Sequence, residues 1–126
     1  MNPQLDILLI EDSQTQAVRF QLMLERAGYH VAVMADGAAG WRKVCTEPPR
    51  MVLLDIDLPS LDGFQILSRL KRDRRTAAIP VVMLTHRDNV KSVQRAIDLG
   101  ADDYLFKDDV AYSLCATVAQ ALQSVS

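Results

Sequence analysis

Cysteine and histidine are scarce in this chain, which removes most transition-metal and disulfide chemistry. Of the 126 residues, two are cysteines and two are histidines. Cys45 and Cys115 stand far apart without a metal-ligand spacing, so we expect two free thiols, with a disulfide as the alternative. We expect His30 and His86 to be surface or partly buried residues rather than ligands. The free thiols favour a reducing, cytoplasmic location.

Long apolar runs and an excess of either charge are also missing. The longest apolar runs have the length of strands, and residues 1–6 lack a signal-peptide pattern, so we expect no membrane span. A net charge of −2 gives no broad cationic field for nucleic acid or anionic lipid. One basic run is expected to be a solvated face and consists of Arg69, Lys71, Arg72, Arg74 and Arg75.

What is present is the balance of an ordinary globular domain, with 49% hydrophobic and 24% charged residues. We expect residues 1–126 to form one domain, either alone or as the N-terminal part of a longer chain. Five short apolar segments alternate with five segments of helical periodicity. The expected strands are residues 5–10, 29–34, 51–54, 79–84 and 104–106. The expected helices are residues 14–27, 37–45, 64–70, 90–99 and 111–125. This alternation predicts an α/β fold, a parallel sheet with helices on both faces.

Chemically useful side chains follow four of the five expected strands. Glu11 and Asp12 follow the first strand, Asp55 the third, Thr85 the fourth and Lys107 the fifth. Sites of open parallel sheets form at the carboxyl ends of the strands, so these groups should converge on one edge. Two carboxylates ~4 Å apart repel by about 4 kcal/mol at an effective dielectric of roughly 20, so the cluster needs a cation. Oxygen ligands without His or Cys favour Mg²⁺.

The stretch "MVLLDIDLP" places an acid directly after a buried strand. A metal with an open coordination position beside Asp55 suits phosphoryl transfer to that carboxylate. Lys107 and the Thr85 hydroxyl could hold the oxygens of the transferred group. We therefore expect Asp55 to be a nucleophile.

The ordered set "LIEDS", "LLDIDLPSLDGF", "VVMLTH" and "GADDYLFKDD" resembles the receiver domain of bacterial two-component response regulators, of the chemotaxis-regulator type. The resemblance covers essentially the whole chain. It implies a doubly wound, five-stranded, flavodoxin-like three-layer sandwich with strand order 2-1-3-4-5. It also implies a phosphorelay signalling domain rather than an enzyme with turnover. Such a domain takes a phosphoryl group from a sensor histidine kinase or phosphotransfer protein and undergoes autodephosphorylation.

By the same resemblance, Asp55 is the phosphoacceptor and Lys107 the phosphate-binding lysine. Asp12 would bind Mg²⁺ directly, Glu11 would act through water, and the backbone carbonyl of Asp57 would be a further protein ligand.

Thr85 and Tyr104 match the switch pair of the family, in which the hydroxyl moves towards the phosphoryl group and the aromatic ring turns inward. For Tyr104, a half-buried core aromatic is the alternative. Pro59 and Gly63 match the turn beside the site.

Several positions depart from the commonest family sequence. Asp108 follows Lys107 where the family usually has Pro, so we expect a trans peptide bond there and a changed aim of the lysine. His86 is bulkier than the usual small residue. Asp57 adds an acid at the mouth of the site, and we expect it to pair with Arg87 and to modulate the phosphoryl lifetime.

The last expected helix contains no Lys or Arg and is unusually apolar. Its apolar residues exceed one narrow stripe and are Tyr112, Leu114, Cys115, Val118, Ala119 and Leu122. We expect a homodimer or an output domain to dock through the fourth helix, fifth strand and fifth helix.

Three other functions compete with this interpretation. A haloacid-dehalogenase-like phosphatase also has Asp-x-Asp after an apolar strand, but Leu58-Pro59 replaces its Gly-Thr. A flavin module would need a phosphate loop where Glu11-Asp12 would repel phosphate. A degenerate receiver could signal without phosphorylation.

Overall fold

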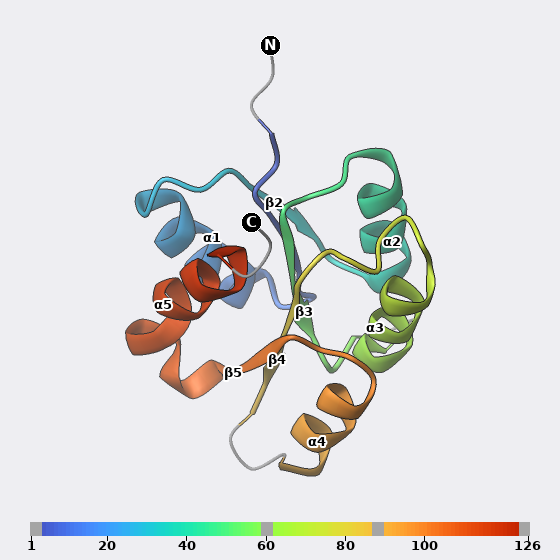
Figure 1. The fold of residues 1–126 in the computed structure, drawn as a ribbon. Helices are drawn as coiled ribbons and strands as arrows, with labels where there is room; N and C mark the ends of the chain where they lie inside the picture. Colours follow the sequence, from blue (N-terminus) through green and yellow to red (C-terminus); the bar gives the residue numbers. More distant parts are fainter. Residues whose placement is uncertain (1–3, 59–61, 87–89, 124–126) are drawn as a thin grey trace.

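The computed structural model describes residues 4–58, 62–86 and 90–123 and contains one five-stranded parallel sheet in the order β2-β1-β3-β4-β5 (Figure 1). The strands are β1 Ile7–Ile10, β2 Val31–Met34, β3 Met51–Asp55, β4 Val81–Thr85 and β5 Asp103–Phe106. The helices are α1 Gln14–Arg26, α2 Gly37–Thr46, α3 Gly63–Arg72, α4 Val90–Asp98 and α5 Val110–Gln123, with a short 3-10 helix at Lys107–Asp109. The predicted fold class and strand order are confirmed.

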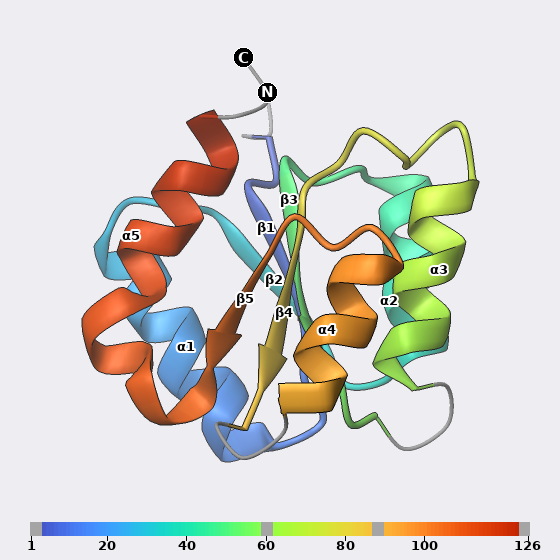
Figure 2. The ribbon, with the colours of Figure 1, turned by 60° about the horizontal axis from the view of Figure 1, so that its bottom comes forward.

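Helices cover both faces of the sheet, which gives the three layers visible in Figure 2. Because side chains alternate along a strand, Ile7 and Leu9 face one layer while Leu8 and Ile10 face the other. The first layer consists of α1 and α5, and the second of α2, α3 and α4. In the part of the chain that the structure describes, no helix has the length and apolarity needed to cross a bilayer.

The strand boundaries differ from the predicted ones for identifiable reasons. β2 begins at Val31 because the N–H of Tyr29 donates back to the carbonyl of Leu24 and so completes the end of α1. β4 begins at Val81 because Pro80 has no N–H for the ladder. β3 extends one residue further than predicted, to Asp55, which pairs with Leu84 of β4.

The helices begin and end where local signals place them. Ser13 and Asp36 accept hydrogen bonds from backbone N–H groups in the first turns of α1 and α2. Asp62 and Gln65 form a reciprocal capping box at the start of α3. Gly28 follows α1 with a φ of 98°, a left-handed conformation that favours glycine.

A partly exposed contact ties the end of α3 to the start of two strands. The ammonium of Lys71 donates to Asp102 Oδ2 at 2.8 Å and to the carbonyl oxygen of Ile79 at 2.9 Å. The same oxygen of Asp102 accepts the backbone N–H of Val81 at 2.8 Å. The prediction that the basic run is a solvated face is therefore wrong for Lys71, whose side chain is only 16% exposed.

Asp102→Ala should lower the free energy of unfolding by about 1–3 kcal/mol, because the Lys71 ammonium and the Val81 N–H both lose their carboxylate. Urea unfolding followed by circular dichroism measures the change. Asp98→Ala, which removes an exposed carboxylate bonded to Gln94, is the matched control and should stay within about 0.5 kcal/mol of wild type. Equal effects of the two substitutions would contradict a structural role for Asp102.

Candidate functional site

The strand order brings the predicted site residues to one edge of the sheet. β1 and β3 are neighbouring strands, and Ile10 of β1 lies opposite Leu54 of β3. The next residue of each segment, Glu11 and Asp55, therefore lies at the same end of the sheet. The chain reverses its direction of winding at this pair, which is where open α/β sheets form their sites. Figure 2 shows β4 and β5 ending at the same edge. Thr85 and Lys107 therefore arrive beside the two acids.

Lys107 makes the central contacts of this edge. Its Nζ lies 3.0 Å from Glu11 Oε2 and 3.2 Å from Asp55 Oδ2. The three side chains are almost completely buried, with 8%, 0% and 3% exposure for Lys107, Glu11 and Asp55. An ammonium thus stands between two buried carboxylates that would otherwise repel each other.

Glu11 is held by the backbone on one side only. Its Oε1 accepts the N–H of Ser13 at 3.1 Å. The Ser13 side chain caps α1, so this residue contacts both the helix and Glu11. Glu11 Oε2 has its ionic contact with Lys107, but within the described residues it accepts no hydrogen bond of good geometry. A buried carboxylate oxygen with spare acceptor capacity fits a site that takes a further cation or donor.

Asp55 is held by the loop that follows β3. Its Oδ1 accepts the N–H of Asp57 at 3.1 Å. Burial, together with the charge of Glu11, raises the pKa of the Asp55 carboxyl to about 7, although Lys107 opposes this shift. Burial lowers the pKa of the Lys107 ammonium, but the charges of Asp55 and Glu11 outweigh it and raise that pKa above its ordinary value. The lysine therefore stays charged.

Asp12 completes an acidic cluster at this edge. Carboxylate oxygens of Glu11, Asp12 and Asp55 lie within 4.8 Å of one another, with Asp12 exposed and the other two buried. Carboxylate oxygens are the ligands of hard cations such as Mg²⁺, which keeps waters and other oxygen ligands in its remaining positions. The cluster could therefore hold a divalent cation on its solvent side.

Three further predicted residues, Thr85, His86 and Asp57, belong to the ends of β3 and β4 or follow them closely. Thr85 is buried, and among the described residues its hydroxyl makes one long contact of 3.5 Å, with the carbonyl oxygen of His86. His86 and the Asp57 side chain are exposed. Pro59 and Arg87 lie outside the described residues, and so does the predicted pair between Asp57 and Arg87.

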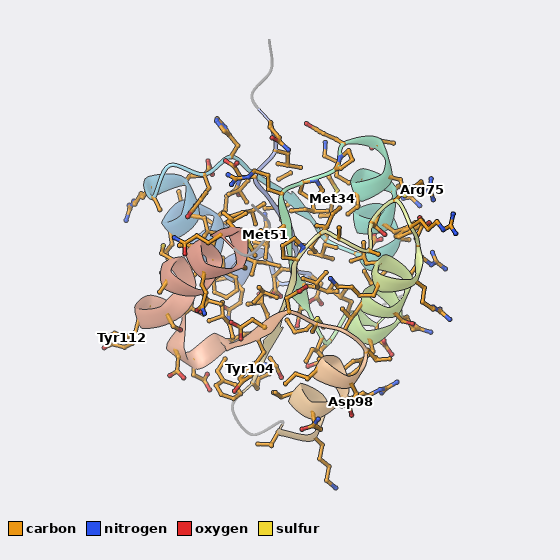
Figure 3. The ribbon with its side chains drawn as sticks, viewed as in Figure 1. Met34, Met51, Arg75, Asp98, Tyr104 and Tyr112 are labelled. Carbon is orange, nitrogen blue, oxygen red and sulfur yellow. The ribbon has the colours of Figure 1, made fainter. Side chains whose placement is uncertain are left out.

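Tyr104 lies on β5, at the edge of the sheet (Figure 3). Its ring is 37% exposed, packs edge to face against Phe106 and lies outside both core clusters. The backbone N–H of Tyr104 donates to the carboxylate of Asp103 at 2.8 Å.

The departure from the usual family sequence at Asp108 does not turn the Lys107 side chain away from Glu11 and Asp55. Residues Lys107–Asp109 form a turn of 3-10 helix, and Asp108 is exposed. As predicted, the Lys107–Asp108 peptide is trans, and none of the peptide bonds in residues 4–58, 62–86 and 90–123 is cis. The predicted change in the aim of the lysine does not follow, because its ammonium still lies at ion-pair distance from Glu11 and Asp55.

Gly63 fixes the distance between the start of α3 and the end of β3. Its N–H donates to the carbonyl oxygen of Ile56 at 2.8 Å. A Cβ at this position would lie 2.3 Å from the carbonyl oxygen of Asp55 and 2.7 Å from Ile56 Cα, and neither backbone atom can move freely. Only glycine allows this approach.

A family model described as the response regulator receiver domain matches residues 7–119. This chain belongs to that family. The match agrees with the ordered motifs and supports a receiver domain over the phosphatase and flavin-module alternatives.

Two curated relatives place the receiver domain in different contexts. The chain is 38% identical over 117 residues to the DNA-binding dual master transcriptional regulator RpaA of Synechocystis sp., covering 93% of this chain but 48% of RpaA. It is 35% identical over 116 residues to protein PilH of Pseudomonas aeruginosa, covering 92% of this chain and 96% of PilH. The chain thus spans about half of the first relative and nearly all of the second.

Solved receiver domains share the fold. The receiver domain of NtrX from Brucella abortus superposes with a TM-score of 0.88 at 28% identity, covering 94% of this chain and 99% of that domain. The signal receiver domain of a signal transduction histidine kinase from Syntrophus aciditrophicus gives a TM-score of 0.86 at 32% identity, with 96% and 92% coverage.

Gly63→Ala should lower the free energy of unfolding by about 2–3 kcal/mol, because its Cβ would overlap backbone atoms at the end of β3. Gly28→Ala is the control: its Cβ meets nothing within 4 Å, so only the positive φ opposes it, at about 1 kcal/mol. Urea unfolding of both variants provides the comparison. A Gly63→Ala protein as stable as the control would show that the α3 start can move away from β3.

Proposed function

We propose that this receiver domain is a phosphorylation-dependent switch of a two-component phosphorelay in the cytoplasm. Asp55 accepts a phosphoryl group from the phosphohistidine of a sensor histidine kinase or phosphotransfer protein. The observation that carries this proposal is the buried contact of Asp55 with Lys107, at 3.2 Å, inside a cluster of three carboxylates.

The Asp55 carboxylate is the nucleophile. One of its oxygens forms a bond to phosphorus as the phosphorus–nitrogen bond of phosphohistidine breaks, and the imidazole nitrogen keeps the electron pair. The hydrogen bond from the N–H of Asp57 orients the carboxylate. Ionisation is required for attack, and a cation beside the carboxyl favours the ionised form that burial and Glu11 disfavour.

The acidic cluster fits Mg²⁺ by its donor chemistry, since its side-chain ligands are all carboxylates. Asp12 and Asp55 would hold the ion directly, together with the backbone carbonyl of Asp57, and Glu11 would act through water. When bound, the ion supplies positive charge that stabilises the oxygens of the transferred group.

Lys107 supplies the second positive charge. Its ammonium already lies beside Asp55 and remains protonated because of the acids around it. It would bind an oxygen of the phosphoryl group on the side away from the metal. Self-catalysed transfer thus rests on residues of this chain, and autodephosphorylation by water ends the signal, so the domain has no catalytic turnover of its own.

Thr85 and Tyr104 would pass the modification to the surface. The Thr85 hydroxyl is weakly bound, so a phosphoryl oxygen can attract it without breaking a strong hydrogen bond. Its movement would leave room for the Tyr104 ring to turn inward from its exposed position. Asp57, His86 and Arg87 would modulate the lifetime of the phosphoryl group by controlling water access.

The surface of α4, β5 and α5 is the proposed partner face. Tyr112 projects from α5 and is 92% exposed (Figure 3). Val90 and Ile97 of α4 and Tyr104 of β5 are also exposed. We propose that residues 1–126 act as one receiver domain that docks a second copy or an output domain on this face.

Incubation with Mg²⁺ and acetyl phosphate should add the mass of one phosphoryl group to the intact protein. Asp55→Asn should show no such adduct, since it removes the nucleophile, and a chelator should abolish uptake by the wild type. Asp98→Asn is the control, because its exposed carboxylate lies outside the acidic cluster. An adduct of equal yield on Asp55→Asn would refute the assignment, and continuous release of phosphate from small esters would favour the phosphatase alternative.

Thr85→Val keeps the shape of the side chain but removes the hydroxyl that would meet the phosphoryl group. Phosphorylated Thr85→Val should show less than about half of the wild-type chemical-shift change at Tyr104 in NMR spectra, because a hydrogen bond is lost. Thr85→Ser should retain the change. Identical shift changes in wild type and Thr85→Val would remove Thr85 from the switch.

A further inference from the structure

A groove between α3 and α4 lies outside the phosphoacceptor site and shares only α4 with the proposed partner face. It has a volume of about 330 Å³ and is lined by Phe64, Gln65, Ser68, Arg69, Arg72, Arg95 and Leu99. Phe64 is buried and Leu99 half-buried, whereas the three arginines are exposed. The groove therefore combines apolar groups with three guanidinium groups.

These arginines were expected to belong to a solvated run, or had no predicted role. The structure divides that run. Lys71 is turned inward to Asp102, and Arg75 pairs with Asp73 at 2.8 Å. Arg69 and Arg72 instead line the groove with Arg95, which comes from a different helix.

Aromatic rings hold two of the three guanidinium groups in place. The guanidinium of Arg95 lies over the ring of Phe64, 4.3 Å from its centroid. That of Arg69 lies over the ring of Trp41 in α2, at 5.4 Å. Stacking uses the flat face of a guanidinium and leaves the N–H groups around its edge available to an anion. Such pre-positioning lowers the entropy lost on binding.

The carboxylates on these two helices and their flanks have partners other than the groove arginines. Asp62 caps α3, Asp73 pairs with Arg75, Asp98 accepts from Gln94, and Asp102 binds Lys71. Within residues 4–58, 62–86 and 90–123, the guanidinium groups of the groove form no ion pair with a carboxylate. A protein of net charge −2 thus carries a concentrated positive site here.

We propose that this groove binds an acidic helical segment of a partner protein, with carboxylates on the arginines and an apolar side chain against Phe64 and Leu99. Arg69 and Arg72 stand three residues apart on α3, a separation of about 4.5 Å along the helix axis. Carboxylates at i and i+3 or i+4 of a helix have a matching spacing of roughly 5–6 Å. A helix laid in a groove presents its apolar side chains at the same intervals.

The groove is better suited to a peptide than to a nucleotide. The positive charges are spread over two helices along an open groove instead of being gathered around one point. The lining side chains other than the arginines supply only Gln65 and Ser68 as hydrogen-bonding groups for a base. Pairs of arginine and carboxylate give direction through their forked geometry and are strong contributors to protein interfaces.

The test uses fluorescence anisotropy with three probes and the full chain. The first is a labelled helical peptide with glutamates at i and i+4 around two leucines, the second its Glu→Gln counterpart, and the third labelled adenosine monophosphate. Arg72→Ala and Arg95→Ala should each weaken binding of the acidic peptide by about 5–10-fold, since each removes a charge-assisted pair. Arg74→Ala, in the same run but outside the groove, is the matched control and should change it by less than about 2-fold.

Further measurements make each outcome decisive. Arg95→Lys keeps the charge but loses the guanidinium that lies over the Phe64 ring, so it should bind at an intermediate strength. Circular dichroism confirms that every variant is folded. NMR shift changes should map to α3 and α4. The proposal would be overturned if the Glu→Gln peptide bound equally well, if Arg74→Ala weakened binding as much as the groove variants, or if the NMR shift changes were confined to β5 and α5. Nucleotide binding without peptide binding, or no binding at all, would also overturn it.

Discussion

The buried ammonium of Lys107 between Glu11 and Asp55 is the interaction on which the rest of the site depends. Parallel strands with this order bring acids from two neighbouring strand ends together, and burial deprives them of the water that would screen their repulsion. The lysine balances that charge from the far end of the chain. The fold must therefore be complete, through β5, before the acids can share one pocket.

The same pocket explains how one carboxylate is distinguished from its neighbours. Asp12 is exposed and remains well hydrated, Glu11 is fixed by the backbone of Ser13, and Asp55 is held by the loop that Gly63 supports. Glu11 and Asp55 are both buried and both contact the lysine, but only the backbone N–H of Asp57, from the loop after β3, holds Oδ1 of Asp55. Position in the fold, more than residue type, thus gives the three carboxylates different surroundings.

The strand ends could be predicted from sequence because apolar runs mark the strands, and the carboxyl ends of parallel strands must meet at one edge. The α/β class followed from the alternation of apolar and helical segments, and the strand order followed from the resemblance carried by the motifs. The division of the basic run could not be predicted, since the inward turn of Lys71 depends on Asp102, far along the chain. For the same reason no local pattern linked Arg95 to Arg69 and Arg72. The start of β2 was misplaced because the N–H of Tyr29 bonds back to α1. The apolar segment that begins at Tyr29 gives no sign of this hydrogen bond.

Asp103, whose carboxylate accepts the backbone N–H of Tyr104, affects how other proteins can assemble on β5. An edge strand normally offers unpaired N–H and carbonyl groups to a strand of another chain. Here Asp103 already occupies one of these donors, and the strand is only four residues long. Extension of the sheet into a second molecule is thereby discouraged, which protects an open parallel sheet from edge-to-edge aggregation. A partner that docked at this edge would therefore contact side chains, and its release would not require breaking a ladder of backbone hydrogen bonds.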